Sequence, residues 1–180
     1  SGCGKSTLLR VLAGLIPAKS GTADLNGISL NDRDHFQENV TYAGHLDAIK
    51  PQLTVAENLR FWADLFGSDG FEKTLKDFQL TEISNRLAQT CSAGQKRRLG
   101  LARIAVSARD LWLLDEPTVS LDAETTQQFA ALIDAHCAQG GMALIATHID
   151  LGLTNATELR LNPIGPAQKT DATDPFLSGD

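Results

Sequence analysis

With 180 residues, of which 42% are hydrophobic, the chain is long enough for one domain with a buried core and too short for two. The formal net charge of −6 argues mildly against a non-specific nucleic-acid binder, which would carry an excess of basic residues. No apolar run approaches the roughly 20 residues that a transmembrane helix needs, and no secretory signal is recognisable.

The first third of the chain alternates between helical and strand patterns. Apolar residues recur at helical spacing over residues 5–16. Short strands are predicted over residues 22–30 and 39–43, with turn residues between them. A helix followed by short strands is the first indication of a mixed α/β domain.

The middle of the chain is predicted to be helical. Thr54 can cap a helix that runs to about Phe66, and residues 71–85 suit shorter helices. A longer helix is expected over residues 92–107. Because no buried-strand run interrupts this region, residues 54–98 are predicted to form a helical subdomain.

The last third returns to strands and helices. In chain order it is predicted to hold a buried strand, an amphipathic helix, a second buried strand and a final short strand, over residues 111–114, 123–138, 142–147 and 158–161. This alternation indicates an α/β fold with a mostly parallel sheet flanked by helices. We expect one domain over residues 1–165 and a mobile tail over residues 166–180.

The first residues fit the end of the phosphate-binding pattern G-x-x-x-x-G-K-[ST]. The predicted ATP-binding loop comprises Ser1, Gly2, Cys3, Gly4, Lys5, Ser6 and Thr7. Backbone N–H groups of such a loop converge on phosphate oxygens, and the helix that follows adds its positive end. Lys5 would then reach the β- and γ-phosphates, and the Ser6 hydroxyl would bind Mg²⁺. Taken alone, the segment could also be a glycine-rich turn before a helix.

The chain begins inside this motif and without an initiator methionine. We therefore expect a fragment whose N-terminal strands are missing. A whole P-loop domain would place a buried strand before the loop, and the first glycine of the pattern would lie two positions before Ser1.

Two acidic residues, Asp115 and Glu116, follow the predicted strand over residues 111–114. Asp115 at the strand end can hold the coordination shell of Mg²⁺, and Glu116 can accept a proton from an attacking water. A surface loop is a weak alternative, because four apolar residues precede the pair. A phosphate loop combined with such a pair predicts hydrolysis of a nucleoside triphosphate.

Several further segments resemble the motifs of ABC transporter ATP-binding subunits. In chain order they match the signature, the Walker B motif, the D-loop and the H-loop, at residues 91–95, 115–118, 119–122 and 147–148. With the phosphate loop, these ordered motifs span residues 1 to about 150. The chain therefore resembles this family of P-loop NTPases, which implies ATP and Mg²⁺ as its ligands.

The resemblance also implies roles for individual residues. In the family, the signature binds the γ-phosphate held by the opposite subunit, which implies a homodimer with ATP sandwiched between the copies. The residues in that position here are Ser92, Ala93, Gly94 and Gln95. Glu116 would be the catalytic base, and His148 would contact the γ-phosphate and steady the attacking water. Asp122 would couple the two sites across the dimer.

Three positions depart from the family pattern. Cys91 replaces a leucine and Ala93 replaces a glycine in the signature. His45 stands where the family has the Q-loop glutamine, and a histidine could bind a metal or donate a hydrogen bond there. These departures point to one subfamily. Residues 42–45 and 53–62 resemble the haem-exporter subfamily, the ATP-binding export proteins of cytochrome c biogenesis.

This resemblance implies a peripheral subunit on the cytoplasmic face of a bacterial inner membrane. It would dock on integral membrane subunits, bind no nucleic acid and make no direct contact with haem. Three alternatives remain: an ABC ATPase that serves another cargo, a non-transport ABC ATPase, and a nucleotide-binding regulatory module without enzymatic activity. Glu116 and His148 argue against the last of these.

Overall fold

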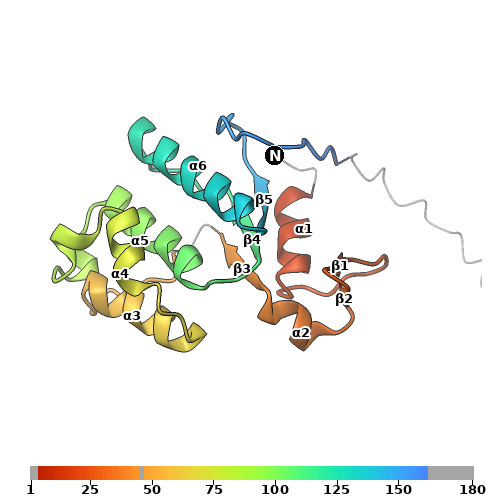
Figure 1. Cartoon of the computed structure of the whole chain (residues 1–180), viewed down its shortest axis with the longest axis horizontal. Coiled ribbons are helices and arrows are strands. Elements are labelled where there is room, and N and C mark those ends of the chain that lie inside the picture. The colour runs from red at the N-terminus through yellow and green to blue at the C-terminus, as the bar shows by residue number, and fades with distance from the viewer. Residues whose placement is uncertain (1–3, 45–46, 162–180) are drawn as a thin grey trace, which may run out of the picture.

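The centre of the molecule is a three-stranded parallel sheet. The computed structural model describes residues 4–44 and 47–161. The strands are ordered β3-β4-β5 and comprise Val40–Ala43, Leu111–Asp115 and Met142–Ala146. Figure 1 shows this sheet between helix α1 on one side and helices α5 and α6 on the other. The parallel pairing confirms the predicted α/β architecture.

One face of the sheet is covered by helix α1 (Lys5–Leu12). Leu9 of this helix is buried against Leu113 of β4 and Ala146 of β5. Because α1 is anchored in this way, its first turn lies beside the ends of β4 and β5.

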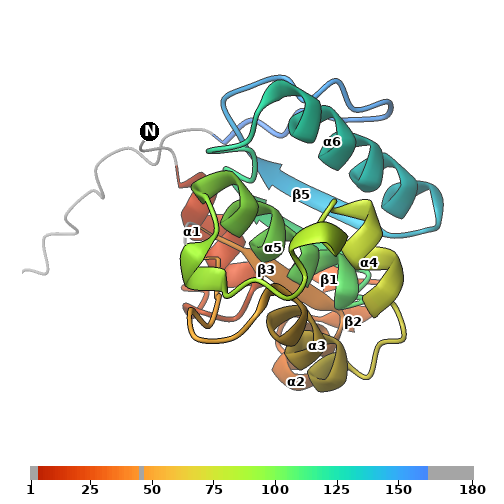
Figure 2. The same ribbon diagram turned by 90° about the vertical axis from the view of Figure 1, so that its left-hand side faces the viewer.

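The other face is covered by helices α5 (Ala93–Val106) and α6 (Ala123–Ala138). Trp112 and Leu114 of β4 point into this larger core, and α6 lies along β5 (Figure 2). Successive residues of a strand point to opposite faces, so a strand buried on both faces reads as a continuous apolar run. This is why β4 could be predicted from the sequence.

Helix α1 ends earlier than predicted. Apolar residues at helical spacing continue to residue 16, yet the helix ends at Leu12. Gly14 takes a left-handed backbone conformation with φ of 70°, and its N–H donates to the carbonyl of Val11. Such a glycine turns the chain out of the helix, whatever the side chains beyond it.

The strand predicted over residues 22–30 is instead a small hairpin. Strands β1 (Asp24–Leu25) and β2 (Ile28–Ser29) pair antiparallel. Asn26 and Gly27 between them both have positive φ, the geometry of a two-residue hairpin turn. A short helix, α2 (Arg33–Glu38), then follows where the sequence predicted only turn residues.

The middle of the chain is helical, as predicted. Helices α3 (Val55–Phe66) and α4 (Phe71–Asp77) pack against α5. Two 3₁₀ turns, η1 (Thr81–Ile83) and η2 (Ala88–Thr90), lead back to α5. The buried residues of these helices join the same core as the central strand. A separate helical subdomain over residues 54–98 stays a prediction.

Helix α3 begins with the capping interaction that its sequence predicts. The Glu57 N–H donates to the Thr54 hydroxyl oxygen at 3.1 Å, and the Thr54 N–H donates to the Glu57 carboxylate at 2.7 Å. The hydrogen bond from the Thr54 backbone lowers the pKa of Glu57. Each side chain thus satisfies an amide that the helix leaves without a partner.

Replacement of Thr54 by Ala should lower the free energy of unfolding by about 1 kcal/mol, because this N-cap bond is lost. Thr54→Ser keeps the hydroxyl and should stay close to the wild type. Urea unfolding followed by circular dichroism measures both variants. Equal stability of the two would contradict the capping role.

The prediction of a strand over residues 158–161 is wrong. This segment has no regular structure, although its sequence alternates apolar and polar residues. Leu159 is exposed, and Arg160 pairs with Glu158 in solvent. Alternation produces a strand only where a neighbouring strand supplies hydrogen bonds, and this segment is paired with none of the described strands.

Some predictions fall outside the described residues. They are the loop residues Ser1, Gly2 and Cys3, the Q-loop position His45 and the tail over residues 166–180. Within the two described ranges, no helix combines the length and the apolar character needed to cross a membrane.

Candidate functional site

The predicted site residues meet at the carboxyl edge of the parallel sheet. Asp115 is the last residue of β4, and it lies opposite Ala146, the last residue of β5. Glu116 follows β4, and His148 stands two residues after β5 ends. The carboxyl ends of parallel strands share one edge, where open α/β sheets bind ligands.

The first turn of α1 contacts this edge through Ser6. The Ser6 hydroxyl donates to Asp115 Oδ1 at 3.0 Å, and the Tyr42 hydroxyl donates to Asp115 Oδ2 at 3.4 Å. These two hydroxyls come from α1 and β3, so the carboxylate joins three elements. The packing of Leu9 on the sheet sets the distance between Ser6 and Asp115.

Asp115 is a buried carboxylate, with 1% of its surface exposed. Among the described residues, no Lys or Arg forms an ion pair with it. Arg10 is a nearby basic group, because Tyr42 and then the charge of Asp115 raise the pKa of Arg10, but it forms no ion pair with this carboxylate. A buried anion without an ion-pair partner is costly, and a bound cation would offset that cost. Hydroxyl and carboxylate oxygens are ligands that Mg²⁺ accepts, with phosphates and water completing its shell.

Lys5 is the first residue of α1 and precedes Ser6. Gly4 caps the helix in a left-handed conformation, with φ of 83° and no side-chain hydrogen bond. The first amides of α1 therefore face outward without an intrahelical partner, the arrangement that favours an anion. Thr7 is exposed in the same turn.

Glu116 and His148 form the second contact of the site. His148 Nε2 lies 3.2 Å from Glu116 Oε1. The Glu116 backbone is left-handed, with φ of 50°, and its N–H donates to the Ala146 carbonyl at 2.8 Å. A non-glycine residue holds such a conformation only when its surroundings impose it. The carboxylate is thus turned toward the loop that follows β5.

The segment that resembles the ABC signature begins helix α5. The Gln95 N–H donates to the Ser92 hydroxyl oxygen at 3.2 Å, and the Ser92 N–H donates to the Gln95 side chain at 2.9 Å. Ser92 and Ala93 are exposed at this end. At Gly94, a Cβ would lie 3.4 Å from the Ser120 carbonyl, so a small residue suits the position. The helix start is open to a ligand from outside the chain.

Asp122 and Cys91 have structural roles in the folded chain. Asp122 caps α6, and the hydrogen bonds from Thr125 lower the pKa of Asp122. Cys91 is buried in the larger core, so it fills the space that a leucine would fill in the family pattern. The proposed coupling role of Asp122 across a dimer stays a prediction.

The structure therefore brings two predicted pairs together, Ser6 with Asp115 and Glu116 with His148. The described contacts of the signature residues lie within α5 and with the loop after β4. Tyr42, which contacts Asp115, is a site residue that the sequence motifs did not predict. Its position on the strand before the Q-loop segment, next to the strand of Asp115, was the available signal.

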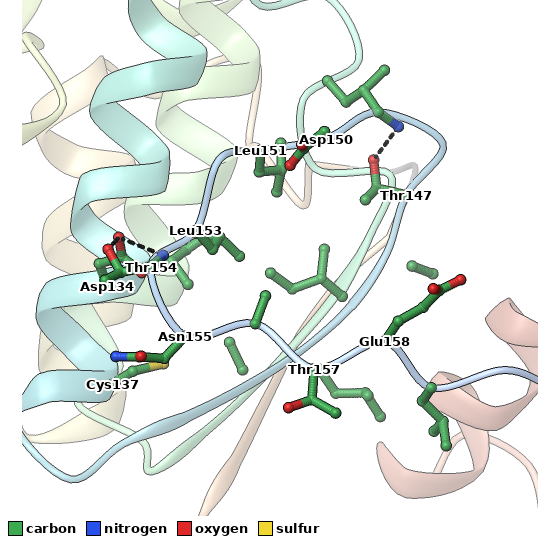
Figure 3. Close-up of a pocket in the computed structure, with 18 of the residues that line it drawn as sticks. Asp134, Cys137, Thr147, Asp150, Leu151, Leu153, Thr154, Asn155, Thr157 and Glu158 are labelled. Atoms are coloured by element: carbon green, nitrogen blue, oxygen red, sulfur yellow. Dashed lines mark hydrogen bonds between the residues drawn. The ribbon is translucent and has the colours of Figure 1, made fainter.

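A cavity of about 870 Å³ adjoins the site, between α1, β5, α6 and residues 149–161 (Figure 3). The segment along its rim is tied to α6, because the Thr154 hydroxyl donates to Asp134 Oδ2 at 2.8 Å. Its described lining reaches Lys5 and Thr147 but includes neither acidic residue of the site. The cavity therefore borders the phosphate site and does not form it.

Comparison with known proteins gives one family and a consistent set of relatives. A family model described as "ABC transporter" matches residues 1–119. The cytochrome c biogenesis ATP-binding export protein CcmA of Paracoccus denitrificans is 52% identical, over 91% of this chain and 73% of that protein. The protein of the same description from Cereibacter sphaeroides is 49% identical, over 98% of this chain and 80% of its own length.

Two solved structures share the fold. One is a dimeric ATP-binding cassette in a post-hydrolysis state, bound to ADP and Pi, with a TM-score of 0.71 over 82% of this chain and 71% of that chain. The other is the ATP-binding subunit of an ABC transporter, with a TM-score of 0.72 over 82% of this chain and 65% of that chain. Each is 24% identical to this chain.

Proposed function

The chain belongs to the ABC transporter family, among the ATP-binding export proteins of cytochrome c biogenesis, and from this premise we propose that it powers a haem exporter by hydrolysing ATP. One observation carries the proposal. The Ser6 hydroxyl lies 3.0 Å from the Asp115 carboxylate, although 109 positions separate the two residues. A phosphate-loop hydroxyl beside a strand-end carboxylate is the ligand pair that P-loop ATPases use for MgATP.

The loop and the start of α1 bind the phosphates in this proposal. Lys5 neutralises the β- and γ-phosphates, and the outward amides of the first turn donate to their oxygens. The preceding residues Ser1, Gly2 and Cys3 supply the rest of the loop by sequence pattern. His45 is assigned to the edge of the same site, also by sequence pattern.

Ser6 and Asp115 hold Mg²⁺ in this proposal. The buried carboxylate without a basic partner and the adjacent hydroxyl fit that ion. When bound, Mg²⁺ offsets the charge that develops on the phosphate oxygens. Tyr42 keeps the Asp115 carboxylate turned toward Ser6 by donating to its second oxygen.

Glu116 is the proposed catalytic base. Its carboxylate accepts a proton from the water that attacks the γ-phosphate. His148, at 3.2 Å from Glu116 Oε1, orients that carboxylate and contacts the γ-phosphate. Both side chains are partly open to solvent, which allows substrate and water to reach them.

The active unit is proposed to be a homodimer. The exposed start of α5 presents the Ser92 hydroxyl and the amides of Ala93 and Gly94 to the γ-phosphate bound by the other copy, and Gln95 caps this end by bonding to Ser92. Asp122 couples the two sites; it stands two positions after Ser120, whose carbonyl lies beside Gly94. The dimer bound to ADP and Pi in the similar fold is the arrangement on which this part of the proposal is based.

The membrane subunits are proposed to dock on the helical region over residues 54–98. Phe61 and Leu65, four residues apart on α3, are 40% and 61% exposed. Exposed apolar side chains that share a helix face suit a protein partner. In this proposal the chain is a peripheral subunit, bound to those membrane subunits on the cytoplasmic face of a bacterial inner membrane.

Complementation of a deletion strain tests whether haem export is the process that this subunit serves. In a bacterium that lacks its own copy of this subunit, the full-length protein should restore covalently haem-bound c-type cytochromes, detected by haem staining after electrophoresis. It should also co-purify with integral membrane subunits. Hydrolysis of ATP by the purified protein without restoration of the cytochromes would indicate another cargo.

A further inference from the structure

Arg97 is a buried cation that the proposed mechanism does not yet use. It lies in the second turn of α5 and is 6% exposed. Its Nε donates to the Pro117 carbonyl at 2.9 Å, and its two terminal nitrogens donate to the carbonyls of Glu116 and Gly44, at 2.9 and 3.1 Å. One of them also contacts Asp47 Oδ1 at 2.6 Å. One guanidinium thus joins α5, the loop after β4 and the chain after β3.

We propose that Arg97 is a positioning residue for hydrolysis, because it holds the backbone of Glu116 in the conformation that aims the carboxylate at His148. The proposal rests on the proposed role of Glu116 as the base. Arg97 acts through the peptide units of Glu116 and Pro117.

The conformation of Glu116 needs such support. Its left-handed backbone is unfavourable for a residue with a Cβ, and the environment must offset that cost. The N–H of Glu116 is held by the Ala146 carbonyl, and its carbonyl is held by Arg97. Both backbone polar groups of the catalytic residue are therefore fixed, one by β5 and one by α5.

Arginine suits this position better than lysine. Four hydrogen bonds diverge from one planar group toward acceptors on three segments, which a single ammonium on a flexible stem cannot reproduce. Gly100 completes the arrangement one turn further along α5. A Cβ there would lie 2.6 Å from the Asp47 side chain, so the missing side chain lets Asp47 approach Arg97.

Arg97→Lys in the full-length protein tests the proposal. Because loss of the carbonyl contacts misplaces the Glu116 carboxylate, we expect kcat for ATP hydrolysis to fall about 10- to 100-fold. The affinity for ATP and the melting temperature should change little, since Lys5, Ser6 and the charge opposite Asp47 remain. Asp47→Asn leaves the three carbonyl contacts in place and should lose less activity than Arg97→Lys. Arg33→Lys, at an exposed arginine of α2, is the control expected to behave as the wild type.

Hydrogen exchange supplies a readout that does not depend on hydrolysis. In Arg97→Lys, the amides of Glu116 and Thr118 should exchange faster than in the wild type, while the amides of β5 stay protected. Unchanged exchange and unchanged kcat would overturn the proposal. Equal losses of kcat, ATP affinity and melting temperature would also overturn it, because they indicate a purely structural arginine. Absence of ATPase activity in the wild type would refute the proposed function. The hydrogen-exchange result would still test whether Arg97 holds the backbone of Glu116.

Discussion

Replacement of Glu116 by Gln is expected to lower kcat for ATP hydrolysis by about 100- to 10,000-fold, the usual contribution of a general base. The amide keeps the size of the side chain and can still contact His148, so the fold and the affinity for ATP should be preserved. Only the ability to accept a proton from the attacking water is lost.

The same variant should accumulate as an ATP-bound dimer. We propose that ATP binding closes the dimer and that hydrolysis reopens it, so an enzyme that binds ATP without hydrolysing it remains closed. Light scattering coupled to size-exclusion chromatography should show a dimer for Glu116→Gln in MgATP and a smaller dimer fraction for the wild type. Glu72→Gln, at an exposed glutamate of α4, is the matched control and should hydrolyse ATP normally. Normal turnover by Glu116→Gln would refute the assignment of the base.

Replacement of Asp115 by Asn should separate activity from stability. The amide oxygen can accept the hydrogen bond from Ser6, and the amide NH2 can donate to the Tyr42 hydroxyl oxygen. The amide lacks the negative charge that attracts Mg²⁺. We expect hydrolysis at low Mg²⁺ to fall by about 100-fold or more, comparable with the largest losses from altered metal surroundings. The melting temperature without nucleotide should stay the same or rise, because a buried anion without a basic partner has been removed.

Titration of Mg²⁺ in the hydrolysis assay, together with thermal unfolding of the apo protein, measures both effects. Asp110→Asn, at an exposed aspartate just before the same strand, is the matched control. An Asp115→Asn protein with normal Mg²⁺ dependence and a lowered melting temperature would show that the carboxylate serves the fold and not the metal.

The sequence was sufficient to predict those elements that depend on local interactions. The caps Thr54 and Ser92 each bond to the residue three positions later, and both helices begin where these side chains predict. Helix α6 matches its predicted bounds, and β4 follows from a short apolar run that ends in an acid. The site was predicted from ordered motifs, each of which is readable within a few residues.

Long-range contacts could not be read in this way. The four acceptors of Arg97 lie between 19 and 53 positions away, and nothing in the Lys96-Arg97-Arg98 run marks the middle residue as the buried one. The hairpin turn at Asn26 and the early end of α1 depend on left-handed backbone conformations that periodicity does not encode.

By itself, the sequence determined the helix caps, the central strands and the residue types of the phosphate and acidic motifs. All of these depend on neighbours within about one turn or one strand. Only the tertiary structure decided that Ser6 reaches Asp115, that Glu116 faces His148 and that residues 158–161 form no strand. The physical reason is that a buried polar group or a strand edge is stable only when distant segments supply its partner, and the packing of the whole chain determines which segment that is.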